Sequence, residues 1–471
     1  MKKTFLFFLF GICFSLQSQV KQFSVTLDNF PTAMVNHTTI DTENNEKWVS
    51  SFGHGLIHWR ADDSLDVYTR KNSLLPNDTV FSTLIDSEQN LWVATFGGGL
   101  AKIDSENNWT IYDHSNSPLP SNFVTRIRED QEGNVWVSSV EFLSINMQGI
   151  NGGGIAKINV DGVWTVYNKD NSLLPTNNIF SMEFDQNNNL WIGCIDAQSD
   201  SEVLAGGGLV KLNTTSNEWT LYDTNNSDIP ANGIFTITPT ESGELYIGTL
   251  FGKLAILDVN GNWNTFYDVG TTDPESGSFH CLNIVVKEDA IFLGAGPADI
   301  LCGPSIGGFM ESSGIYEFQK TTNDDITLMS TTPMNFWGST IVNQILLDGD
   351  DFWISTYLQG LFAYNPQGVN HIPDINFDYE APDGIEQISL VGKIYPNPVS
   401  NYLIFETSDP SLTNEAEAVL IWDITGKILF QQDIKSNASN IRINLPDGLP
   451  HTFFVGLKIG EELYVEKMVR E

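Results

Sequence analysis

Short hydrophobic runs, broken at regular intervals by glycine, asparagine, aspartate and proline, fill the chain between residues 30 and 370. Residues 91–95 (Leu-Trp-Val-Ala-Thr) are one such run, and the triplet at 97–99 (Gly-Gly-Gly) follows it. Apolar runs of this length between turn-forming residues are typical of β-strands. No segment shows apolar residues at helical spacing, so we expect this part of the chain to be all-β.

The runs recur in groups of four, and an aromatic residue marks the second run of each group. The spacings between successive markers are 44, 44, 55, 55, 46 and 61 residues. Four strands in a period of about 40–45 residues are the signature of a propeller blade. We predict a seven-bladed β-propeller over residues 20–370. Its markers are Trp48, Trp92, Trp136, Trp191, Tyr246, Phe292 and Trp353.

Two features of the repeat carry structural predictions. A blade cannot cover its own two apolar faces, so we expect the tryptophan and tyrosine positions to pack between blades. Glycine triplets follow the second run in three copies, at 97–99, 152–154 and 206–208. We expect each triplet to turn the second strand into the third, where a side chain would crowd the neighbouring backbone.

The N-terminus predicts a secretory signal peptide. Met1-Lys2-Lys3 is basic, residues 4–14 are almost all apolar, and polar residues 17–19 suit cleavage near 18–19. A run this short is typical of a signal peptide rather than of a permanent membrane anchor. We assign residues 1–19 to the signal peptide. No later stretch is long and apolar enough for a transmembrane helix, so we expect no membrane insertion.

Residues 392–471 show a different pattern of short alternating strands, which predicts a small immunoglobulin-like β-sandwich. This segment resembles the type A C-terminal sorting domain of the type IX secretion system of Bacteroidota. The resemblance rests on a Tyr-Pro-Asn-Pro opening, an Asp-Ile-Thr-Gly-Lys hairpin and a basic last strand. It implies export to the cell surface or the medium, with the secretion machinery as partner. The implied signal residues are Tyr395, Pro396, Asn397, Pro398, Gly426, Lys427 and Lys467.

The Asn-x-Leu-Trp-Val and Gly-Gly-Gly-Leu motifs of the repeat resemble the propeller in the periplasmic sensor region of two-component regulators. In that family a membrane helix and a histidine kinase follow the propeller. Here the next segment, residues 371–391, is polar and acidic. We interpret it as a linker, and the stretch from 366 to 390 is also our candidate for the strand that closes the ring.

The charge of the chain limits its partners. The formal net charge is −36, and −32 of this lies outside residues 393–471. Such an excess of acid repels polyphosphates, which argues against nucleic acids and anionic membranes as ligands.

Catalytic and metal-binding patterns are scarce, and we predict no catalytic residue and no metal ligand. His54 and His58 lie four residues apart, but in a strand-and-turn context that does not present them on one helical face. The turns at 86–90, 130–134 and 185–189 are rich in the oxygen atoms that calcium prefers. Local side-chain-to-backbone hydrogen bonds explain the same residues. We therefore expect no cofactor, with calcium in these turns as the alternative.

Two function classes stay open. The first is a secreted or cell-surface binding module whose ligand is a glycan or an envelope protein. The second is a secreted hydrolase or lyase acting on polysaccharide, with loop carboxylates as acid and base. Sialidase propellers need clustered arginines, and only Arg126 and Arg128 lie close together here. That weakens the enzyme hypothesis, which we rank second.

Long insertions indicate where a ligand would bind. By propeller topology, the loops between second and third strands open on the same face as the connections between blades. The longest insertions all belong to these two classes, and binding residues concentrate in long loops on rigid scaffolds. We predict this ligand face, with candidate contacts Glu141, Phe142, Asp196, Asp200, Glu202, Asp299, Phe336 and Trp337.

Overall fold

The computed structural model describes the seven repeats and the strands of the C-terminal segment. The described residues are 19–23, 30–32, 34–140, 152–195, 207–249, 254–266, 279–287, 290–297, 314–320, 326–330, 341–357, 360–365, 392–395, 402–407, 416–422, 428–433, 440–445, 452–459 and 462–469. Every regular element within them is a strand, as expected. No helix capable of crossing a membrane occurs in this part of the chain.

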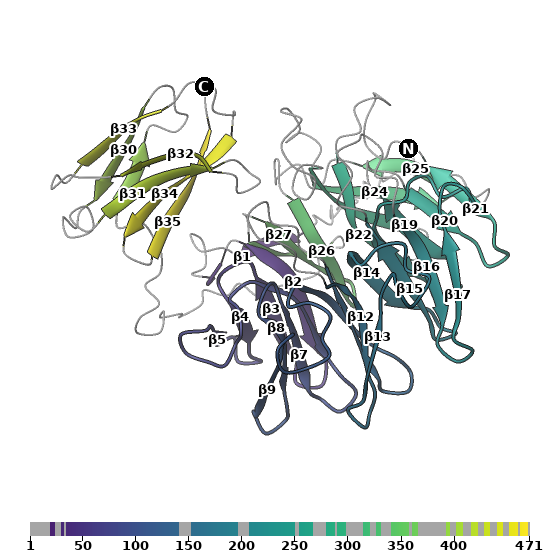
Figure 1. Ribbon diagram of the computed structural model, residues 1–471. Coiled ribbons are helices and arrows are strands. Elements are labelled where there is room, and N and C mark those ends of the chain that lie inside the picture. Colours follow the sequence, from purple (N-terminus) through teal and green to yellow (C-terminus); the bar gives the residue numbers. More distant parts are fainter. Residues whose placement is uncertain are drawn as a thin grey trace, which may run out of the picture.

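Seven four-stranded antiparallel sheets form the propeller, which confirms the predicted blade count (Figure 1). Blade one contains β2 (Val35–Asp41), β3 (Glu46–Ser51), β4 (Leu56–Trp59) and β5 (Leu65–Tyr68). Blade two contains β6 (Val80–Ile85), β7 (Leu91–Thr95), β8 (Gly99–Ile103) and β9 (Trp109–Tyr112). Blade three contains β10 (Val124–Glu129), β11 (Val135–Ser139), β12 (Gly154–Ile158) and β13 (Trp164–Tyr167).

The next three blades repeat this order. Blade four contains β14 (Ile179–Phe184), β15 (Asn189–Cys194), β16 (Gly208–Asn213) and β17 (Glu218–Tyr222). Blade five contains β18 (Ile234–Pro239), β19 (Leu245–Thr249), β20 (Leu254–Leu257) and β21 (Trp263–Phe266). Blade six contains β22 (Phe279–Lys287), β23 (Ala290–Pro297), β24 (Gly314–Lys320) and β25 (Ile326–Ser330).

Blade seven is completed by the N-terminus of the chain. It contains β26 (Ile341–Asp348), β27 (Asp351–Tyr357) and β28 (Gly360–Asn365), and β1 (Gln19–Phe23) pairs antiparallel with β28 as its fourth strand. The expectation that residues 366–390 supply the closing strand is therefore wrong. Gln19, which we assigned to the signal peptide, is the first residue of β1 and lies opposite Asn365.

Aromatic side chains connect neighbouring blades as the repeat predicted. Tyr112 on the fourth strand of blade two stacks on Trp92 of its own blade, with ring centroids 6.1 Å apart. The same ring meets Trp164 of blade three edge to face at 5.3 Å. Blades three and four repeat this contact with the next blade through Tyr167 and Tyr222. Each tyrosine thus covers the marker of one blade and the outer strand of the next.

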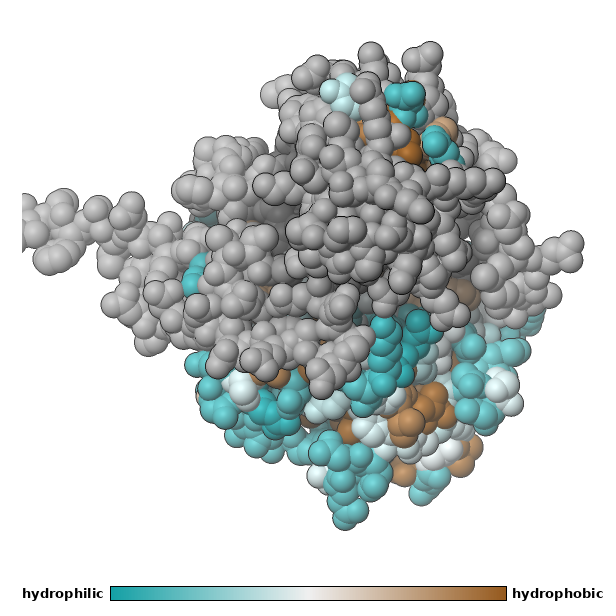
Figure 2. Space-filling view, turned by 90° about the vertical axis from the view of Figure 1, so that its left-hand side faces the viewer, coloured by the Kyte–Doolittle hydropathy of each residue, from teal (hydrophilic) through white to brown (hydrophobic). Residues whose placement is uncertain are grey.

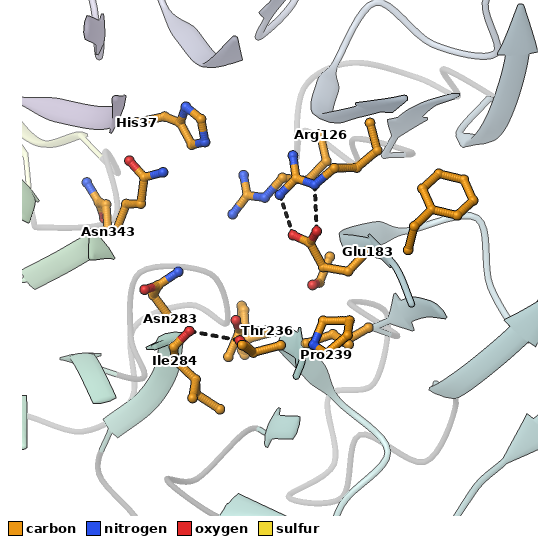
Figure 3. A pocket seen from close by; sticks show the side chains of 15 residues that line it. His37, Arg126, Glu183, Thr236, Pro239, Asn283, Ile284 and Asn343 are labelled. Atoms are coloured by element: carbon orange, nitrogen blue, oxygen red, sulfur yellow. Dashed lines mark hydrogen bonds and ion pairs between the residues drawn. The ribbon is translucent and has the colours of Figure 1, made fainter. Parts of the chain in front are cut away.

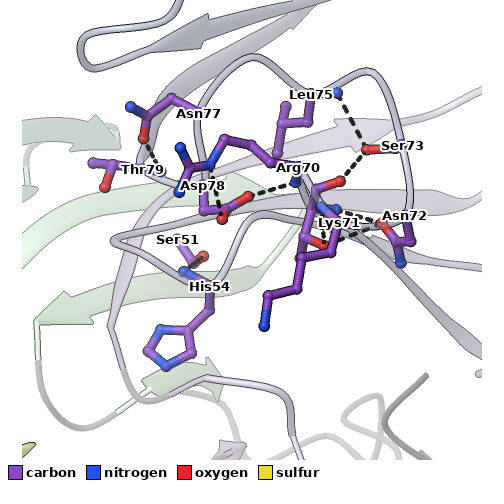
Figure 4. A network of polar contacts seen from close by, with 11 residues as sticks. Ser51, His54, Arg70, Lys71, Asn72, Ser73, Leu75, Asn77, Asp78 and Thr79 are labelled. Carbon is purple, nitrogen blue, oxygen red and sulfur yellow. Dashed lines mark hydrogen bonds and ion pairs between the residues drawn. The ribbon is translucent and has the colours of Figure 1, made fainter. Parts of the chain in front are cut away.

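The Asn-Ser-x-Leu-Pro segment that opens each clear copy is the connection between blades. In the first copy, the Asn72 side-chain oxygen accepts a hydrogen bond from the Thr69 N–H (Figure 4). The Asn72 side-chain NH₂ donates to the Val67 carbonyl. The Ser73 hydroxyl donates to the Thr69 carbonyl and accepts from the Leu75 N–H. Leu75 is buried in the apolar core of blade two. Local hydrogen bonds shape the turn, and the leucine fixes it to the next blade.

The glycine triplets permit close contact between turn and connection, which confirms their predicted role. A Cβ atom on Gly98 would lie 2.7 Å from the backbone of Pro76, and one on Gly152 would lie 2.4 Å from the Pro120 carbonyl oxygen. Gly99 also has a φ of +91°, which favours glycine. A side chain at any of these positions would separate the turn from the connection.

The C-terminal segment forms two antiparallel sheets. One has the order β29 (Gly392–Tyr395), β30 (Tyr402–Thr407), β33 (Asn440–Asn444). The other has the order β32 (Ile428–Asp433), β31 (Ala416–Trp422), β34 (Thr452–Ile459), β35 (Glu462–Val469). Tyr395 ends β29 and Lys467 lies in β35, whereas Pro396, Asn397, Pro398, Gly426 and Lys427 lie outside the described residues.

Figure 2 shows one face of the molecule, and the described residues on it are mostly hydrophilic with small hydrophobic patches between them. The exposed large hydrophobic side chains all lie in turns and connections rather than in strands: Phe52, Leu74, Val160, Val163, Leu173 and Val259.

Candidate functional site

The first strand of every blade carries a β-bulge at the same point. The register shifts between Val35 and His37 in β2 and between Val124 and Arg126 in β10, and the other first strands shift at the matching position. A bulge bends the strand and re-aims the side chains beside it. The residue after each bulge is polar. We call these residues the inner tier: His37, Ser82, Arg126, Ser181, Thr236, Asn283 and Gln344.

The partners of the inner tier on the second strands are small. They are Ser50, Ala94, Ser138, Gly193, Gly248, Gly294 and Ser355. At two of the glycines the next blade comes close: a Cβ on Gly193 would lie 2.9 Å from the Ile234 carbonyl oxygen, and one on Gly294 would lie 2.8 Å from the Val342 side chain.

A cavity of about 330 Å³ lies among these first strands (Figure 3). All inner-tier residues except Ser82 line it, together with residues two positions further along, such as Arg128 and Glu183. Figure 3 shows His37, Arg126, Glu183 and Asn283 reaching toward one open space from different blades. The ring of blades therefore encloses a polar central site.

Two carboxamides of the inner tier use their oxygen atoms to join blades. The Gln344 Oε1 accepts a hydrogen bond of 2.6 Å from the Thr38 N–H of blade one, and the Asn283 Oδ1 accepts one of 3.0 Å from the Ile345 N–H of blade seven. A backbone N–H can only donate, so these bonds fix which end of each amide is oxygen. The two NH₂ groups are then the ends left to donate to a ligand.

Arg128 and Glu183 form an ion pair across blades three and four. The Arg128 Nε donates to Glu183 Oε2 at 2.7 Å, and Nη2 donates to Oε1. A third donor, Nη1, bonds the Ile127 carbonyl at 2.7 Å. A two-point contact of this kind holds both side chains in one orientation. Both charges are therefore engaged within the protein.

Arg126 differs from Arg128, because no carboxylate of the described residues pairs with it. Its Nη1 donates to the Thr125 carbonyl at 3.1 Å. Burial, with the nearby Arg128 charge as a smaller cause, lowers the pKa of Arg126 to about 10. The guanidinium remains protonated at neutral pH. Glu183 offsets one of the two arginines, so the described lining carries one net positive charge.

His37 is neutral in this setting. Burial lowers its pKa well below 6.5, and the charges of Arg126 and Arg128 lower it further. The ring Nδ1 lies 3.4 Å from the Thr39 hydroxyl. At pH 7 the imidazole therefore offers one donor and one acceptor and adds no charge.

Replacing His37 with asparagine should reduce the acid sensitivity of the fold. Below pH 6.5 the unfolded chain protonates this histidine before the folded chain does, so unfolding takes up a proton and stability falls as pH falls. The slope from one such group is at most about 1.4 kcal/mol per pH unit. We expect a shallower fall in His37→Asn between about pH 6.5 and 5, measured by urea unfolding at several pH values.

The control for this prediction is His114→Asn, which changes an exposed histidine on a turn. His54 and His58 also have a lowered pKa, chiefly through burial, but they are present in every variant and their effect cancels. An unchanged pH dependence in His37→Asn would contradict the prediction.

His58 of the His54–His58 pair and the oxygen-rich turns have structural partners. His58 stacks on Trp48 at 3.8 Å and bonds the Glu46 carboxylate at 2.6 Å. In the second turn, Asp130 accepts hydrogen bonds from Glu132, Asn134 and the Trp136 indole. No group of three or more histidine, cysteine, aspartate or glutamate side chains arranged for a metal ion occurs among the described residues.

The predicted ligand face lies largely beyond the described residues. All eight of its candidate contacts, from Glu141 to Trp337, fall there. Its topology is visible in two blades, where the Gly55 N–H donates to the Asp78 carbonyl at 2.8 Å and the Gly97 N–H to the Asn122 carbonyl at 2.9 Å. In these blades the turn between second and third strands does lie against the connection between blades.

Sequence reasoning noticed Arg126 and Arg128 only as neighbours and missed the inner tier. The sequence does contain a pattern that indicates the inner tier. A polar residue stands nine to eleven positions before every marker, from His37 before Trp48 to Gln344 before Trp353. The hairpin between first and second strands brings that residue to the middle of the ring.

Two family models match parts of the chain. Residues 393–471 match a secretion system C-terminal sorting domain. Residues 74–97, 118–141 and 173–196 match a two component regulator propeller. The chain thus carries regulator-type propeller repeats and a type IX sorting domain, which directs secretion to the cell surface or the extracellular space. No curated protein matches it.

Solved structures share the fold at low identity. The extracellular domain of a hybrid two component system from B. thetaiotaomicron is 14% identical with a TM-score of 0.54, over 96% of this chain and 59% of that chain. PorZ, a surface component of the type-IX secretion system of Porphyromonas gingivalis, is 14% identical with a TM-score of 0.52, over 95% and 61%.

Virginiamycin B lyase from Staphylococcus aureus, solved with quinupristin, is 14% identical with a TM-score of 0.51, over 74% of this chain and 99% of that chain. The chain spans about three fifths of the length of the B. thetaiotaomicron and P. gingivalis proteins. Identities this low establish the propeller fold alone.

Proposed function

We propose that this chain, with its regulator-type repeats and type IX sorting domain, is an extracellular binding module that recognises a glycan or an envelope protein. The propeller holds the ligand, and the C-terminal segment, an immunoglobulin-like sandwich, engages the secretion machinery. The observation that carries the proposal is the central cavity. Its lining presents the Arg126 guanidinium and the NH₂ groups of Asn283 and Gln344 to a ligand.

The lining favours binding over hydrolysis. Glycoside hydrolysis usually needs two carboxyl groups, one on each side of the bond that breaks. Glu183 is the single carboxylate among the described residues that line the cavity, and both its oxygens accept hydrogen bonds from Arg128. Cys194, a nucleophile by residue type, is buried, and burial raises the pKa of its thiol. A polysaccharide hydrolase or lyase therefore stays the second candidate.

The predicted ligand face complements the cavity in this proposal. Loops around the ring would contact the outer parts of a large ligand, and the cavity would hold one of its groups. The eight loop contacts remain a prediction from the sequence.

Deleting residues 392–471 should stop export. We expect the shortened protein to accumulate in the periplasm of a type IX-competent host, while the full chain reaches the surface or the medium. Cell fractionation with protease shaving measures the distribution. Limited proteolysis of the periplasmic material tests whether the propeller is folded. Surface display of the shortened protein would contradict the assigned role of this segment.

Binding itself is tested with the mature full chain on an array of glycans and envelope extracts, with product release assayed in parallel. A ligand that is retained unchanged supports the binding module. Release of cleaved sugar would move the chain to the hydrolase or lyase class. No retained ligand in any fraction would overturn the proposed function.

A further inference from the structure

We propose that the central cavity binds a small hydroxylated carboxylate, a sugar acid by chemical class, and that Arg126 holds its carboxylate. The inference rests on the proposed function, because it names the ligand chemistry of the same site. It draws on three independent features of the described lining: an unpaired guanidinium, a set of neutral hydrogen-bonding groups, and the sign and size of the local charge.

Arg126 supplies the anion contact. Its one hydrogen bond goes to the adjacent Thr125 carbonyl, so most of its five N–H donors remain available. Arg126 is partly buried at this cavity, and a bound carboxylate would offset its positive charge there. The planar fork of arginine matches the two oxygens of a carboxylate. Arg128 cannot take this role, because its Nε and Nη2 already donate to the two carboxylate oxygens of Glu183.

The remaining lining suits hydroxyl groups. Ser181 and Thr236 contribute hydroxyls, and Asn283 and Gln344 contribute NH₂ groups whose oxygen ends are already bonded. A ligand carrying several hydroxyls satisfies such a lining, whereas an alkyl carboxylate would leave these groups without partners. The volume of about 330 Å³ is at the lower end of small-molecule sites, which fits one sugar unit.

The net charge of the cavity lining favours a ligand with a single negative charge. The lining carries one net positive charge, because Glu183 offsets Arg128 and His37 is neutral. The chain as a whole has a formal net charge of −36. That charge repels a polyanion far more strongly than it repels one carboxylate among hydroxyls.

Calorimetric titration of the mature full chain tests the inference with D-glucuronate and D-glucose, which differ at one carbon. We expect glucuronate to bind and glucose to bind at least tenfold more weakly. Arg126→Gln should weaken glucuronate at least tenfold, and Arg126→Lys should restore part of the loss by keeping the charge without the fork. The matched control is Arg60→Gln, which changes a surface arginine paired with Asp66 and should leave affinity unchanged.

Two further ligands test the alternatives to a sugar acid. Hexanoate binding as tightly as glucuronate would overturn the role of the hydroxyls. An acetylated dipeptide with a free carboxylate binding more tightly would assign the site to a peptide C-terminus and overturn the sugar acid. If Arg126→Gln does not fold, the glucuronate affinity of Arg126→Lys tests the proposal by itself. An affinity equal to that of the unaltered protein would overturn the two-point contact between the Arg126 guanidinium and the carboxylate.

The inference and the proposed function can fail separately. If Arg126→Gln retains an array ligand with unchanged affinity, the chain is still a binding module and only the assignment of the cavity is wrong. If the unaltered chain retains no array ligand, the proposed function fails, whatever glucuronate does.

Discussion

Replacing Phe23 with alanine is expected to lower the free energy of unfolding by about 3–5 kcal/mol, the usual range for a buried phenylalanine. Phe23, the last residue of β1, is fully buried. Its ring meets Trp59 of blade one edge to face at 5.0 Å and stacks on Trp353 of blade seven at 6.0 Å. The substitution removes a side chain that packs against both the first and the last blade.

Urea unfolding of the mature protein measures the effect of Phe23→Ala. Phe52→Ala makes the same chemical change at a side chain that is 39% exposed, so it should lower stability by about 1 kcal/mol or less. Equal losses in the two variants would show that the contact between the first and last blades contributes little to stability.

Asp130→Ala is expected to cause the second large loss of folding stability. This buried carboxylate accepts hydrogen bonds from the Glu132 N–H, from the backbone and side chain of Asn134, and from the Trp136 indole at 2.8 Å. Alanine leaves these donors without a partner, and each buried unsatisfied donor costs about 1–3 kcal/mol. Some donors will find water, so we expect a total loss on the order of 3–5 kcal/mol.

Asp104→Ala is the matched control for this turn. Asp104 accepts from the Glu106 N–H and from the backbone and side chain of Asn108 in the same pattern, but on an exposed turn and without an indole. Water can replace it there, so its loss should be much smaller. Thermal unfolding followed by tryptophan fluorescence compares the two. A similar change in melting temperature would show that the Asp130 hydrogen bonds are not a main source of stability.

The repeat could be predicted because its determinants are local. Trp92, for example, lies a few residues after the Asp-Asn turn at 86–90 and a few residues before the glycine triplet at 97–99. The closing strand could not be predicted in this way. Residues 19–23 contain no turn signal or marker, and their place follows only from the free edge of β28 at the other end of the propeller.

The central site was missed for a related reason. Arg126 and His37 belong to different blades, and nothing within either repeat states that they share a cavity. Their proximity follows from the seven-fold register of the first strands, which exists only when the ring is complete. Local patterns indicate a blade, whereas the chemistry at the axis depends on how the blades are arranged.

The pairing of Gln19 with Asn365 has a consequence for folding kinetics. The two strands of this contact are separated by almost the whole propeller, so the closing step has a very high contact order and is expected to be slow. β1 is the first of these strands to be synthesised and must wait, unpaired, until the last blade exists. Until β1 and β28 pair, the edges of both strands are open to intermolecular pairing. The interval before ring closure is therefore when this protein is most exposed to aggregation and proteolysis.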